Sequence, residues 1–131
     1  MKKLVEIEKQ FQNCRELRKV EYDVPELDYT DVSLLKCPGG KYVVYLLMTT
    51  YEGDVIDYDA DIYDNLRDAI DAYKNEIEQI IVDIHLLLAD AEDGVIELDE
   101  FAKRRLKEQL DVMRRELSEV GKLASNPINE S

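Results

Sequence analysis

Apolar residues near the start of the chain recur at intervals of three and four positions. The recurring residues are Leu4, Ile7, Phe11, Cys14 and Leu17. This spacing places them on one face of an α-helix, so the pattern predicts a helix over residues 1–20. The next stretch, EYDVPELDYTD, shows no period and contains Pro25, and we expect it to form an irregular connector.

The pattern changes to that of β-structure between residues 32 and 58. Residues 32–37 and 41–51 are rich in β-branched, aromatic and other apolar residues, and the Pro-Gly-Gly sequence between them is typical of a tight turn. Both alternating sets of side chains over 41–51 are apolar, which predicts a central strand covered on both faces. A short third strand over residues 55–58 is expected to form the edge of this sheet.

From residue 61 onward the period becomes that of long helices. Apolar residues alternate steps of three and four on both sides of Gly94, which predicts two helices with coiled-coil-type seams. Asp61 is the expected N-cap of the first helix, and the second begins at about Leu98. The two should form an antiparallel hairpin over 61–124, each helix ~40 Å long, so that part of the hairpin projects beyond a small sheet. The seam residues are Tyr63, Leu66, Ile70, Tyr73, Ile77, Ile80, Ile84, Leu87, Ala91, Leu106, Leu110, Met113, Leu117, Val120 and Ala124.

These elements together predict one α+β domain spanning residues 1–131. Its parts are an N-terminal helix over 1–20, a small antiparallel β-hairpin or three-stranded sheet over 32–58, the long C-terminal antiparallel helical hairpin and a flexible tail over 125–131. A chain of 131 residues matches the size of a single ordinary domain.

The charge of the chain is strongly negative and concentrated in its middle. The formal net charge is -13, and residues 21–62 contain ten acids and two bases, while residues 63–96 contain nine acids and two bases. Both nucleic acid and an anionic membrane would repel such a protein, so neither is expected as a direct partner. A basic protein is the better candidate.

The amino-terminal residues and the cysteines bear on the cellular compartment. Charged residues interrupt the first ten positions where a signal peptide would need an apolar run, and the two cysteines stand 23 positions apart. The longest apolar stretch, residues 42–48, is too short to cross a membrane. We therefore predict a cytoplasmic protein with reduced thiols.

The stretch EGDVIDYDADIYDNLRDAID holds eight acids against one base, Arg67. A helix that begins at residue 61 would align four of its aspartates in one stripe, and like charges at this spacing repel one another. Such a stripe favours an interaction face for a basic protein, one that imitates the phosphate charges of nucleic acid; the alternative is a merely solvated helix face. The candidate partner-binding residues are Asp54, Asp57, Asp59, Asp61, Asp64, Asp68 and Asp71, with Tyr22 and Tyr29 of the connector.

The leading functional hypothesis is accordingly an acidic, non-enzymatic adaptor or inhibitor. In size, charge and α+β build the chain is similar to small acidic inhibitors made by phages and other mobile elements, a likeness of composition that assigns no family. Its natural target would be a nucleic-acid-binding protein, with competition for the nucleic-acid groove as the mechanism. No catalytic set and no cofactor are expected. The alternative from another class is a structural subunit that oligomerises, for example as a homodimer, through the helical seams.

A second alternative comes from the loop between the two long helices, which resembles the calcium loop of EF-hand proteins. With Gly94 at position six of that loop, Ile96 falls at position eight and Glu100 at position twelve. Positions one and three then fall on Ala89 and Ala91, which have no oxygen to donate. The competing interpretation is a helix stop at Gly94 and a restart capped near Asp99, and no metal ligand is assigned.

Overall fold

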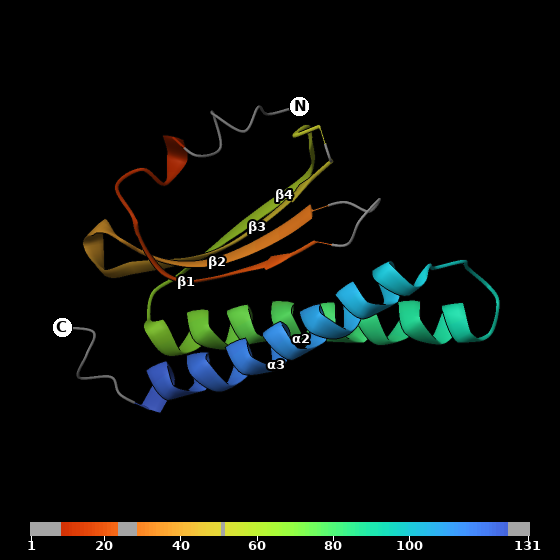
Figure 1. Ribbon diagram of the computed structural model, residues 1–131. Helices are drawn as coiled ribbons and strands as arrows, with labels where there is room; N and C mark the ends of the chain where they lie inside the picture. Colours follow the sequence, from red (N-terminus) through yellow and green to blue (C-terminus); the bar gives the residue numbers. More distant parts are fainter. Residues whose placement is uncertain (1–8, 24–28, 51, 126–131) are drawn as a thin grey trace.

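The computed structural model describes residues 9–23, 29–50 and 52–125 and shows an α+β fold of two layers. One layer is an antiparallel sheet in which four strands follow one another in the order β1-β2-β3-β4. The other is a helical hairpin that packs on one face of the sheet (Figure 1). The elements are β1 (Arg15–Tyr22), β2 (Tyr29–Cys37), a 3-10 turn (Pro38–Gly40), β3 (Lys41–Thr49), β4 (Val55–Tyr63), α2 (Leu66–Glu92) and α3 (Glu100–Ser125).

The predicted helix over 1–20 is wrong from residue 11 onward: residues 9 and 10 are helical, 11–14 form a turn and bend, and 15–20 belong to strand β1. Of the five residues whose spacing predicted this helix, only Leu17 belongs to the strand, at a β-bulge between Glu16 and Arg18. The extra residue, Leu17, packs on the core together with Val20. A bulge therefore separates two core-facing residues by three positions, which is also the spacing of a helix face. The part of the prediction over residues 1–8 lies outside the described residues.

The predicted central hairpin is confirmed. Strands β2 and β3 pair from Tyr29 opposite Thr49 to Cys37 opposite Lys41, and β3 lies between β2 and β4. Gly39 and Gly40 between the two strands have φ angles of 81° and 73°, which side chains rarely tolerate.

The third predicted strand is real but is longer than expected, because β4 continues to Tyr63. Its pairing with β3 ends at Tyr63 opposite Tyr42, so the chain is still extended where the sequence predicted the first helical turn. Asp61 is consequently a strand residue and caps no helix. The N-cap of α2 is Asn65, whose side chain accepts a hydrogen bond from the Asp68 amide at 2.9 Å.

The helical hairpin is confirmed, with a stop and restart close to the predicted residues. Gly94 has a φ of 77° directly after α2, as a helix-terminating glycine does. The Asp99 side chain then accepts a hydrogen bond from the Ala102 amide at 2.7 Å and caps α3. The predicted tail over 125–131 lies outside the described residues beyond Ser125.

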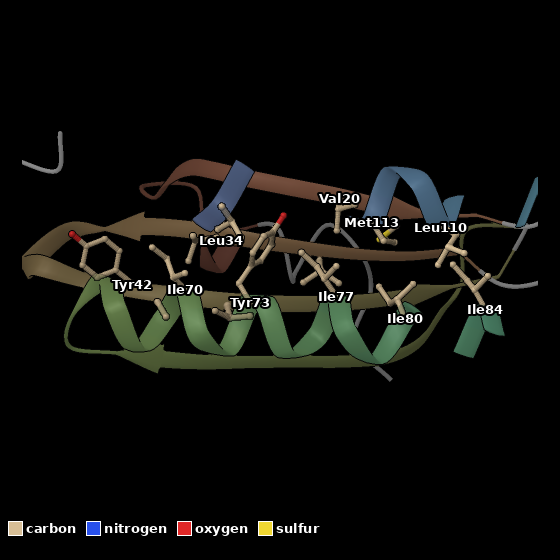
Figure 2. Close-up of a cluster of buried hydrophobic side chains, with 14 of the residues drawn as sticks. Val20, Leu34, Tyr42, Ile70, Tyr73, Ile77, Ile80, Ile84, Leu110 and Met113 are labelled. Atoms are coloured by element: carbon tan, nitrogen blue, oxygen red, sulfur yellow. The ribbon is translucent and has the colours of Figure 1, made fainter. Parts of the chain in front are cut away.

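The core fills the space between the sheet and the two helices. Figure 2 shows the seam side chains of α2 pointing toward the strands, with Leu110 and Met113 of α3 beside them. Ile77 at the centre of this seam has no exposed surface. The seams of both helices are thus covered within one chain.

A polar network ties the two helices to strand β1 beneath the sheet. The Glu116 side chain, only 7% exposed, accepts hydrogen bonds from Arg18 Nε at 2.8 Å and from the Tyr73 hydroxyl at 2.9 Å. Burial raises the pKa of Tyr73 well above its ordinary value, and the negative charge of Glu116 raises it further. One carboxylate on α3 therefore satisfies partners on α2 and β1 at once.

A disulfide between Cys14 and Cys37 joins the residues before β1 to the end of β2. Phe11 in the same segment packs edge-on against Tyr45, with ring centroids 5.3 Å apart, on the sheet face that the helices leave uncovered. Disulfides are rare in compartments that keep thiols reduced, so this bond argues against the predicted reduced cysteines. In the described part of the chain, neither helix is apolar over a length that could cross a membrane.

We predict that Glu116→Ala lowers the free energy of unfolding by about 2–3 kcal/mol, because the Arg18 guanidinium and the Tyr73 hydroxyl lose their common partner. Urea titration measures this change. The matched control is Glu119→Ala, which removes the exposed pair with Lys122 one turn away and a weaker charge interaction with Arg18 but leaves the Glu116 hydrogen bonds in place. It should cost less than ~0.5 kcal/mol. Equal losses in the two variants would contradict the role given to Glu116.

We also predict that the purified protein carries no free thiol and that reduction lowers its free energy of unfolding by roughly 2–4 kcal/mol, because the bond closes a long loop. Alkylation followed by mass measurement counts the thiols, and urea titration with and without dithiothreitol gives the stability. The double variant Cys14→Ser/Cys37→Ser serves as the control and should be insensitive to the reductant. Two alkylated thiols in the unreduced protein would refute the bond.

Candidate functional site

Three aspartates form a row along β4. Asp57, Asp59 and Asp61 occupy alternate positions, so their side chains lie on one side of the strand in steps of ~7 Å. Asp59 pairs in register with Leu46, and Leu46 packs against the core beneath the helices. The row therefore faces the helical layer, and all three aspartates are exposed. We call Asp57, Asp59 and Asp61 the β4 aspartates.

A groove of about 460 Å³ opens beside this row, between the sheet and α2. In Figure 1 the sheet curves away from the helices toward the end of β1 and the start of β2, while the hairpin runs on past the last strand residues. We call this the acidic groove. Both layers contribute apolar residues to its lining. The sheet provides Tyr22, Leu46 and Met48, and α2 provides Ile80 and Leu87.

Acidic residues of α2 line one wall of the groove. Glu76, Asp83 and Asp90 all contribute to the lining and are spaced seven residues apart. Seven residues are close to two helical turns, so the three carboxylates follow one line along the helix. The groove therefore combines an apolar floor with a negative wall.

The pKa shifts show that one acid of α2, Glu76, interacts with two of the β4 aspartates. Burial raises the pKa of Glu76, and the charges of Asp59 and Asp61 raise it further. Burial likewise raises the pKa of Tyr22 to about 12, with a further contribution from Asp83 across the groove. Glu76 of α2 and the pair Asp59 and Asp61 of β4 are thus close enough for their negative charges to repel.

These carboxylates have no ion-pair partner among the described residues. The ion pairs found there involve other acids, such as Asp64 with Lys41 and Asp23 with Arg105. Asp83 accepts one hydrogen bond, from Gln79 Nε2 at 3.1 Å, which brings no positive charge. The six unpaired acids are Asp57, Asp59, Asp61, Glu76, Asp83 and Asp90.

The predicted helical stripe of Asp61, Asp64, Asp68 and Asp71 is wrong, because α2 begins only at Leu66. Asp64 follows β4 and bonds with Lys41, which lowers the pKa of the Asp64 carboxyl. Asp68 belongs to the helix cap, where its carboxylate accepts a hydrogen bond from Asn65 Nδ2 at 3.0 Å.

The other predicted site residues fall in different places. Asp54 lies in the turn before β4, where its amide donates to Thr50 Oγ1 at 3.1 Å. Asp71 is exposed on α2. Tyr22 lines the acidic groove, but Tyr29 is adjacent in the strand to the groove residue Thr30 and so lies on the opposite face of the sheet.

Sequence reasoning missed Glu76, Asp83 and Asp90. Their regular spacing beside the apolar seam was a signal that could have placed them on one helix line. Nothing in the sequence could have shown that this line faces β4, because that depends on how the sheet curves above the helix.

The loop between α2 and α3 lies wholly within the described residues and serves as a helix stop and restart. Asp99, one of its carboxylates, is engaged by the Ala102 amide. Across the described chain, no three histidine, cysteine or acidic side chains are grouped so that they could hold a metal ion.

Comparison of the chain with models of protein families, with curated proteins and with solved structures finds no match. The function is therefore argued from the groove and its charges alone.

We predict that Glu76→Gln raises the free energy of unfolding at pH 7 by a few tenths of a kcal/mol, because it removes repulsion from Asp59 and Asp61. A carboxyl whose pKa is raised on folding favours the native state when it is protonated. The advantage of the variant should therefore vanish as the pH falls below the ordinary pKa of glutamate.

Urea titrations at several pH values test this prediction. The control is Glu78→Gln, which removes the same charge from an exposed position of the same helix. If the free energy of unfolding at pH 7 rises equally in the two variants, Glu76 responds only to the net charge of the protein and has no specific interaction with the β4 aspartates.

Proposed function

We propose that the protein is a non-enzymatic, acidic adaptor or inhibitor that binds a basic protein through the β4 aspartates and the acidic groove. The natural partner is a nucleic-acid-binding protein, and the mechanism is competition for the surface on which that protein holds nucleic acid. The observation that carries this proposal is that Glu76, in the lining of an apolar groove, lies near Asp59 and Asp61, while none of the three has an ion-pair partner among the described residues.

Repulsion among these carboxylates supports a binding role. Like charges held near one another destabilise the folded chain by a small amount for each pair. Lysine and arginine side chains of a partner would replace this repulsion with attraction, so the free energy of the site improves only in the complex. The same field would speed the approach of a basic protein at low ionic strength.

The apolar floor supports a protein partner rather than a simple cation. Leu86 in the lining of the groove is 57% exposed. Met48, also in the lining, pairs in register with Asp57 of β4. Apolar area surrounded by charge is a common composition for a protein interface. A lysine or arginine side chain matches such a site because its stem is apolar and its end is charged.

The structural-subunit alternative is less well supported. It was based on apolar helical seams, and residues such as Ile77, Ile84 and Leu106 in those seams are fully buried within the chain. The metal-sensor alternative is also weaker, since Asp99 is engaged in capping α3. The cytoplasmic location stays a prediction, and the Cys14–Cys37 disulfide favours a compartment that tolerates such bonds.

We predict that neutralising the β4 aspartates, by Asp57→Asn, Asp59→Asn and Asp61→Asn together, weakens binding of an oligolysine peptide roughly tenfold, or about 1.4 kcal/mol. The reason is the loss of one complete row of the site. Isothermal titration measures the affinity. Binding to the unmodified protein should weaken steeply as salt is added, because exposed charges are screened.

The matched control is the triple variant Glu92→Gln, Glu97→Gln and Asp111→Asn, which removes the same charge from exposed positions of the helical hairpin. It should retain most of the affinity. An equal loss in both triple variants would show that only net charge matters and would reject the site.

A further inference from the structure

Strand β4 is an edge of the sheet with one side of its backbone unused by the sheet. It pairs with β3 from Asp57 to Tyr63 and again at Val55, with a register shift at Ile56, and in the described chain no other strand pairs with it. The Tyr58 amide donates a hydrogen bond to the Asp57 side chain at 2.9 Å, which an incoming strand would replace. The other outward N–H and C=O groups of such an edge strand can accept a further strand. Such addition of an extended peptide to a sheet edge is a common mode of peptide recognition.

The two faces of β4 differ in chemistry. The side toward the helices carries the β4 aspartates, and the opposite side carries Tyr58, Ala60 and Ile62. Ile62 is 69% exposed. A strand paired with β4 would place its own side chains opposite these two sets in the same alternation.

The other edge of the sheet lacks these features. Strand β1 contains three basic residues and a β-bulge between Glu16 and Arg18. Arg18 is held by Glu116 of α3. The register shift in β4 lies at Ile56, before the β4 aspartates, so the stretch from Asp57 to Tyr63 is regular and its charged residues are all acidic.

The alternating aspartates also exclude one obvious occupant, a second copy of the chain. If two β4 strands paired antiparallel with their helices on the same side, aspartates would lie opposite aspartates and would repel one another. The same arrangement accepts a strand with cations at alternate positions. The alternating aspartates therefore both repel a second copy of the chain and attract a basic strand.

We propose that an extended segment of the basic partner adds to β4 as a fifth strand. This segment carries lysine or arginine at every second position, facing the β4 aspartates, and uncharged β-forming residues between them, facing Tyr58 and Ile62. The inference rests on the proposed function, because it specifies the conformation and the sequence pattern that the acidic site selects.

Three synthetic peptides test the proposal. The first alternates cations with β-forming residues (KTKVKTK), the second has the same composition with its lysines grouped (KKKKTVT), and the third is the first with the amides facing β4 methylated. Affinity is measured by titration, and amide exchange of β4 by nuclear magnetic resonance. We expect the alternating peptide to bind at least about tenfold more tightly than the other two and to slow exchange of the β4 amides that point away from β3.

The outcomes separate this inference from the proposed function. If all three peptides bind equally and the β4 amides exchange as before, strand addition is refuted while charge-based binding stands. If amide exchange slows only at the groove residues of α2, strand addition is likewise refuted and charge-based binding stands. If none of the peptides binds, the proposed function and the strand addition both fail. If the β4 triple variant no longer binds the alternating peptide and the hairpin control still does, the proposed function and the strand addition are both supported.

Discussion

The arrangement of this molecule follows from a difference in length between its two layers. A helix of 27 residues such as α2 is ~40 Å long, whereas a strand of nine residues spans ~30 Å. The apolar seam of α2 must cover the sheet, and Ile70, Tyr73 and Ile77 do so without leaving exposed surface. The remaining turns pass beyond the strands, and the curving sheet separates from them. The acidic groove is the space that this divergence leaves.

The same constraint decides which carboxylates meet. Because β4 leads directly into α2 through a turn, the helix runs back along the side of the sheet from which the β4 aspartates project. Glu76, on the third turn of α2, then comes close enough to Asp59 and Asp61 for their charges to raise its pKa.

Much of the fold could be predicted from the sequence because local pattern and tertiary packing agree there. The β2–β3 hairpin follows from β-forming residues around Pro38 and two glycines, and the helical hairpin follows from seams separated by Gly94. The first strand could not be predicted because the helical spacing of apolar residues before it extends as far as Leu17, and the bulge at Leu17 interrupts the alternation that is typical of a strand. The end of β4 could not be predicted because its acidic residues are poor strand formers, and pairing with β3 overrides that preference.

The sequence identified several of the acidic residues of the candidate site but placed them on a helix, whereas Asp57, Asp59 and Asp61 lie on a strand. The aspartates around residue 60 are gathered in space, but on a strand, where alternation and not helical spacing selects Asp57, Asp59 and Asp61. This change alters the kind of ligand that fits. A helical stripe would present charge to any basic surface, whereas an edge strand offers charge together with free backbone groups in a fixed register. The β4 aspartates and the acidic groove lie on the same side of the sheet, so an extended basic segment along β4 would direct its cations toward both rows of carboxylates. Selectivity would then depend on the order of residues in the partner as much as on its charge.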